Sequence, residues 1–167
     1  MGGLLAGKLI FEVLIKTRLK MYTGLFHTHS ALRYVVLLLL IVVIAKSLVG
    51  VVSKKTFEKG DGKLTLWLMI ATHTQLLVGI FLYFVSPWVK FTAGTMKDSQ
   101  LRYWTVEHVT IMLIAVVLIT LARGATKKPI DDSAKHKRVL MFTSLALVLI
   151  LVGIIMSGRG ILIPVRA

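Results

Sequence analysis

The stretch ALRYVVLLLLIVVIA, residues 31–45, is too long and too apolar to lie on the surface of a soluble domain. It belongs to an apolar run from about residue 28 to residue 52 that contains only two charged side chains, Arg33 and Lys46. An α-helix rises 1.5 Å per residue, so about 20–25 residues cross the ~30 Å of hydrocarbon in a bilayer. Backbone groups in lipid must bond to each other, so the run is predicted to be a membrane-spanning helix.

Three further apolar runs have a similar length. They cover about residues 64–85, 101–122 and 139–156, and none alternates as a transmembrane strand would. The chain of 167 residues is 56% hydrophobic, against roughly 45–50% in soluble domains. The predicted fold is therefore an all-α membrane protein, an up-down bundle of four transmembrane helices within residues 21–167.

Residues 1–20 form an amphipathic N-terminal extension. Lys8, Glu12, Lys16 and Lys20 recur every four residues, which places them in one narrow polar stripe on a helix. The apolar stretches between them are too short to span a bilayer, so a helix lying in the membrane interface is predicted. The alternative is that the native chain starts at Met21.

The formal charge of +14 comes from 21 Lys and Arg against 7 Asp and Glu. The basic residues flank the apolar runs, which is typical of contact with lipid headgroups and argues against nucleic-acid binding. Ten of them lie in loops 53–63 and 123–138, against only Lys90, Lys97 and Arg102 between the second and third spans. The positive-inside rule therefore predicts that both loops are cytoplasmic, although the basic residues of the N-terminal extension argue the other way. The absence of cysteine excludes disulfides, cysteine-ligated iron–sulfur clusters and covalently attached haem.

Three histidines lie within the predicted spans. His29 and His108 each precede an apolar run on spans that point in the same direction, so we expect them at similar depth in the outer leaflet. His73 lies twelve residues from the outer end of its span, about 18 Å along a helix and nearer the membrane centre. His136, within the basic run Lys135–Arg138, is expected to be a solvated loop residue.

The first and third spans of an up-down bundle are diagonal neighbours. His29 and His108 could then face each other and supply both axial ligands of a non-covalent haem b, with His73 as the competing ligand. Haem propionates need cations nearby, and Arg33, Arg102 and Arg159 are placed to hold them. Glu107 is expected to pair with Arg33 or Arg102.

Two other interpretations remain open. The chain could be a non-catalytic membrane subunit whose histidines form interhelical hydrogen bonds, or it could carry protons or metal ions through His73 and Glu107. No catalytic triad, phosphate-binding loop or dinucleotide fingerprint is present, so no catalytic residues are predicted. An electron carrier or subunit is favoured over a stand-alone enzyme.

Four stretches resemble the small four-span proteins of Bacteroidota that carry the label "cytochrome b". They are MYTGLFHTHSALRYVVLLLL (21–40), ATHTQLLVGIFLYFVSP (71–87), LRYWTVEHVTIMLIAVVLITLAR (101–123) and KHKRVLMF (135–142). The resemblance implies b-type haem, electron transfer, and ligands among His29, His73 and His108. It also implies a multi-pass protein of the bacterial inner membrane. For an electron carrier of this kind, the expected partners are the lipid bilayer and quinone or a redox subunit. The chain departs from better-understood cytochrome b patterns in having no histidine on its fourth span.

Overall fold

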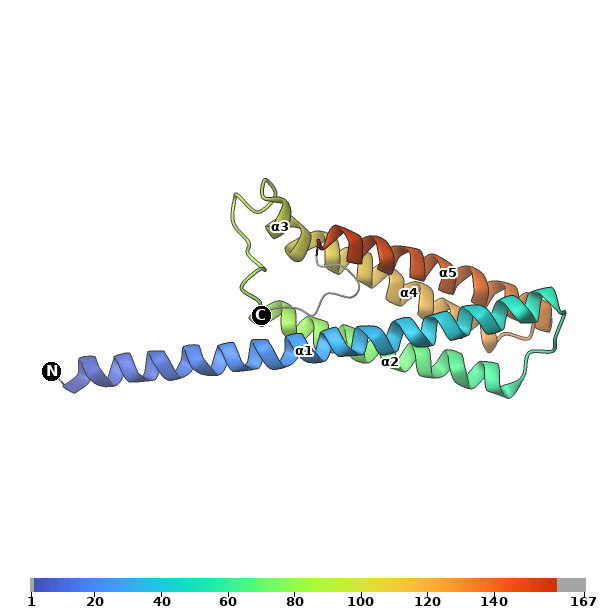
Figure 1. Cartoon of the computed structure of the whole chain (residues 1–167), viewed down its shortest axis with the longest axis horizontal. Helices are drawn as coiled ribbons and strands as arrows, with labels where there is room; N and C mark the ends of the chain where they lie inside the picture. The colour runs from blue at the N-terminus through green and yellow to red at the C-terminus, as the bar shows by residue number, and fades with distance from the viewer. Residues whose placement is uncertain (1, 159–167) are drawn as a thin grey trace.

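The chain folds as a bundle of antiparallel helices, seen in a computed structural model that describes residues 2–158 (Figure 1). All regular elements within these residues are helical, and their bounds are α1 Gly2–Val52, α2 Lys59–Val85, α3 Ser99–Arg102, η1 Tyr103–Glu107, α4 His108–Thr126 and α5 Asp132–Met156. The segment η1 is a π-helix that joins α3 to α4 without a break. Four continuous helical stretches are long and apolar enough to cross a membrane, which confirms the predicted architecture.

The order of the helices around the bundle follows from their packing. Helix α1 packs against α2 and α5, and α4 packs against the same two neighbours. Helices α1 and α4 are therefore diagonal, as predicted for the first and third spans. The short α1–α2 and α4–α5 loops lie at one end of the bundle, whereas α3 and the loop before it lie at the other (Figure 1).

Small and branched side chains fill the centre of the bundle. Leu40, Leu68, Ile119 and Val139 are fully buried there, and alanine and threonine side chains fill the remaining close contacts between helices. The outward faces of the same helices carry large apolar side chains, including Leu38, Phe81, Val117 and Ile155. Because lipid solvates such side chains, this distribution matches a bundle whose surface lies in hydrocarbon.

The N-terminal segment differs from expectation in one respect. It is helical, as predicted, but α1 continues through residues 20–28 as one helix of 51 residues. Such a helix is about 77 Å long, far more than the ~30 Å hydrocarbon thickness. The segment from Gly7 to Lys20 extends beyond the bundle with every side chain exposed (Figure 1).

The prediction that His136 is a solvated loop residue is wrong. Helix α5 begins at Asp132, and His136 is only 2% exposed. The reason is helical periodicity: His136 is followed at intervals of three and four residues by the buried positions Val139, Thr143, Ala146 and Ile150. Its basic neighbours occupy the other faces of the helix.

Candidate functional site

His29 and His108 meet across the diagonal of the bundle. Their ring centroids are 6.4 Å apart and their planes are inclined by 69°. His29 lies in the second half of α1, and His108 is the first residue of α4, directly after the π-helix. This confirms that the two histidines lie at similar depth, as their positions relative to the apolar runs predicted.

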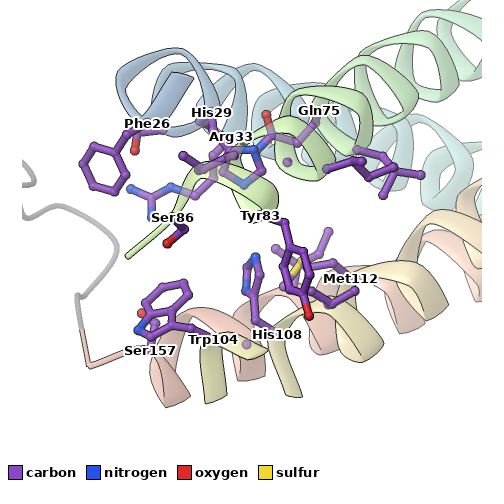
Figure 2. A pocket seen from close by; sticks show the side chains of 18 of the residues that line it. Phe26, His29, Arg33, Gln75, Tyr83, Ser86, Trp104, His108, Met112 and Ser157 are labelled. Atoms are coloured by element: carbon purple, nitrogen blue, oxygen red, sulfur yellow. Dashed lines mark hydrogen bonds between the residues drawn. The ribbon is translucent and has the colours of Figure 1, made fainter. Parts of the chain in front are cut away.

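The two rings border a cavity of about 350 Å³ in the half of the bundle nearer α3. Side chains from α1, α2, η1, α4 and α5 line it, most of them apolar or aromatic. Figure 2 shows His29 and Arg33 on one side and Trp104 and His108 on the other, with Tyr83 and Met112 beside them. A largely apolar cavity with a few converging polar groups is typical of a cofactor or ligand site.

A π-helical turn orients His108. Tyr103, 3% exposed, brings its hydroxyl to 3.2 Å from Nδ1 of His108, and the same hydroxyl donates a hydrogen bond to the carbonyl of Gly153 on α5. In an α-helix, residues five apart point about 140° away from each other. The π-helix closes an i to i+5 hydrogen bond, so Tyr103 and His108 lie on the same side.

These hydrogen bonds determine the tautomer of a neutral His108. The Gly153 carbonyl can only accept, so the Tyr103 hydroxyl uses its one proton there. Its oxygen must then accept from Nδ1–H of His108. The lone pair of the imidazole is therefore on Nε2, the nitrogen opposite the one held by Tyr103.

His29 is held from α2. Gln75 donates from Nε2 to the backbone carbonyl of His29 at 2.9 Å. A Cβ at Gly79 would lie 2.9 Å from Cε1 of His29, so only glycine lets the ring rest on the α2 backbone. Nδ1 of His29 is buried and has no protein hydrogen-bond partner. A buried imidazole nitrogen without a partner is costly, and a bound group or water would relieve that cost.

The three arginines predicted to hold the haem propionates differ in their position relative to the cavity. Arg33 lines the cavity, and its guanidinium donates to the Tyr34 hydroxyl at 3.0 Å. Arg102 does not line the cavity. It pairs with Glu107 at 2.6 Å, one of the pairings expected from the sequence. Arg159 lies outside the described residues.

His73 is separate from the other two histidines. It is half-buried on α2 and its Nδ1 lies 2.8 Å from the carbonyl of Met69, one turn earlier. It does not line the cavity. The structure therefore brings together His29 and His108 and leaves His73 with a local bond.

Sequence reasoning missed Tyr103, Gly79 and Gly153 as parts of the site. To find Tyr103 from the sequence, one would have to know that a π-helix precedes His108. A regular helix with 3.6 residues per turn places Tyr103 and His108 on different sides. The two glycines matter because they let neighbouring side chains pack directly against the helix backbone, which the sequence does not encode directly. At Gly153, for example, a Cβ would lie 2.6 Å from Cε of Met112.

The fold and the site define a small multi-pass membrane protein with a histidine pair inside its helical bundle. Within residues 2–158, no group of three or more His, Cys, Asp or Glu side chains could hold a metal ion. No family model, curated protein or solved structure matches this chain. The chemistry of the site must therefore be inferred from its own residues.

Proposed function

We propose that the cavity binds haem b between His29 and His108, and that the protein passes single electrons within the membrane. One observation carries the proposal, the 6.4 Å separation of the two ring centroids. Two metal–nitrogen bonds of about 2 Å separate the nitrogens by about 4 Å, and about 1 Å more on each side reaches the ring centres, giving about 6 Å in total. The spacing therefore supports the proposal that both imidazoles would hold one iron.

The surrounding residues fit the same group. The tautomer assigned to His108 has its lone pair on Nε2, and a neutral imidazole nitrogen with a lone pair is the group that binds a metal. His29 contributes a second imidazole that is buried and lacks a protein partner at Nδ1. The apolar walls suit a porphyrin, and Arg33 supplies a cation at the cavity for its carboxylates. Arg102 could bind the same carboxylates only if its salt bridge to Glu107 were broken.

Bound haem would supply one-electron redox chemistry. If His29 and His108 both held the iron, no position would remain for oxygen or substrate, so electron transfer would be favoured over catalysis at the metal. The electron partner would be a membrane quinone or a redox subunit. The basic loops would face the cytoplasm, in keeping with the positive-inside rule, and the cavity would then lie in the outer half of a bacterial inner membrane.

The proposal is tested by absorption spectroscopy on detergent-purified protein supplied with haem. A Soret band and a sharp α band in the reduced-minus-oxidised spectrum are expected. His29→Ala and His108→Ala should each abolish the bis-histidine spectrum, whereas the control His73→Ala should retain it. A colourless wild-type protein would refute haem binding and leave a non-catalytic membrane subunit as the better interpretation.

A further inference from the structure

The opposite end of the bundle contains a second buried histidine with unmet hydrogen bonds. His136 is 2% exposed, and neither of its ring nitrogens has a protein partner. Its ring packs against Phe57, with centroids 4.9 Å apart, and lies directly over Gly50 of α1, where a Cβ would come within 2.4 Å of it. Native structures rarely leave such nitrogens without a hydrogen-bonding ligand or water.

His136 borders a cavity of about 350 Å³ between α1, the α1–α2 loop and the start of α2. Four charged residues line this cavity, two basic and two acidic: Lys46, Lys55, Glu58 and Asp61. Asp61 is already engaged, because its carboxylate accepts from Lys46 at 2.8 Å and from the backbone N–H of Glu58 at 3.0 Å. Glu58 forms a capping box with Asp61 at the start of α2, in which its side chain accepts from the backbone N–H of Asp61. Lys55 and Glu58 are both exposed, and the second carboxylate oxygen of Glu58 and the ammonium of Lys55 offer one charge of each sign to a ligand.

We propose that this cavity binds a phosphate group that carries a primary amine, as in the headgroup of an aminophospholipid. The phosphate would accept hydrogen bonds from Lys55 and from a ring N–H of His136, and the ammonium would bond to Glu58. The position agrees with this ligand, since the cavity lies just beyond the apolar part of the bundle, where a lipid places its headgroup.

Charge complementarity separates this ligand from its competitors. A purely anionic headgroup would meet Glu58 without a partner, and a choline headgroup offers no N–H to that carboxylate. A phosphate with a primary amine satisfies both exposed charges and a nitrogen of His136. This site is far from the His29–His108 cavity and does not depend on haem.

The experiment compares nanodiscs of phosphatidylethanolamine, phosphatidylglycerol and phosphatidylcholine by ¹⁵N NMR of histidine-labelled protein. His136→Phe keeps an aromatic ring and identifies the His136 signals by their loss. We expect these signals to shift in phosphatidylethanolamine relative to phosphatidylcholine. A parallel titration of delipidated protein in detergent with soluble phosphoethanolamine distinguishes a lipid ligand from a water-soluble one.

A competition experiment between lipids measures how much each charged side chain contributes to binding of phosphatidylethanolamine. Lys55→Gln and Glu58→Gln should each weaken retention of phosphatidylethanolamine about tenfold, which corresponds to one charge-assisted hydrogen bond of ~1.4 kcal/mol. Lys54→Gln is the matched control, because Lys54 is a neighbouring exposed lysine that does not line the cavity. Identical His136 signals in all three lipids and with phosphoethanolamine would overturn the proposal and assign the cavity to water.

Discussion

At the scale of single residues, the candidate haem site depends on side chains that hold the histidines. Tyr103 fixes the tautomer of His108, and Gly79 makes room for the ring of His29. Neither needs to touch a bound cofactor to affect it. Residues that orient ligands influence affinity and redox potential through the ligand they hold.

Tyr103→Phe tests this positioning role. Removing the hydroxyl leaves Nδ1–H of His108 without its acceptor and makes the imidazole a weaker donor to oxidised iron. We expect haem to remain bound and its midpoint potential to rise by about 40 mV, the equivalent of ~1 kcal/mol for one electron. Redox titration measures the midpoint potential, and Thr110→Val is the control, because it removes an exposed hydroxyl of α4 that does not line the cavity. An unchanged potential in Tyr103→Phe would make that tyrosine merely structural.

Gly79→Ala tests the close approach of α2 to His29. The added methyl would press on the ring at 2.9 Å, so the ring must move and haem occupancy should fall, with a cost to stability of about 1–3 kcal/mol. Haem content per protein and thermal unfolding measure the two effects. Gly124→Ala on α4 meets nothing within 4 Å and should instead leave haem content unchanged. Equal haem content in both variants would contradict the packing argument.

At the scale of elements, the π-helix sets the register between α3 and α4. Its extra residue rotates Tyr103 onto the side of His108. Residues of the cavity from both sides of this turn therefore depend on one local irregularity. π-helical turns of this kind are frequently associated with functional sites.

Deleting Val106, which is 40% exposed, should restore a regular α-helix through this segment. Tyr103 and His108 would then stand four residues apart, about 40° from each other on the same side of the helix, so their hydrogen bond should persist. We expect an inserted, helical protein that keeps its haem bands, measured by circular dichroism and absorption spectroscopy. Loss of the haem bands after the deletion would show that the site needs the π-helical geometry itself and not only the shared side of the helix.

The sequence predicted the elements better than it predicted the contacts between them. Apolar length alone located all four spans, and distance from the run boundaries placed His29 and His108 at one depth. The partners of those histidines depend on features that a 3.6-residue period cannot represent, namely the π-helix before His108 and the close helix contact at Gly79. His136 was obscured by its charged neighbours, although its spacing to Val139 and Thr143 marks a buried face.

At the scale of the whole molecule, the bundle has two chemically different ends. The His29–His108 cavity lies toward the α3 end, and the lysine-rich loops and the His136 cavity lie at the other. If the lysine-rich loops face the cytoplasm, as the positive-inside rule predicts, the proposed haem site would lie in the outer half of the membrane.

Single introduced cysteines test this orientation, because the chain has none of its own. Lys128→Cys in the α4–α5 loop should react with a membrane-impermeant maleimide only after the cytoplasmic side is opened. Lys97→Cys in the loop before α3 should react in intact spheroplasts. The reverse pattern would invert the topology and place the histidine pair in the inner leaflet.

The unbroken course of α1 carries its N-terminal part well beyond the bundle. The part before Phe26 reaches about 36 Å along the helix axis, so a tilt of about 10° in the span would swing the tip by about 6 Å. In a straight helix of this length, a small rearrangement around His29 would therefore produce a larger displacement at the N-terminal tip. A neighbouring protein or the bilayer surface in contact with the tip would be displaced with it.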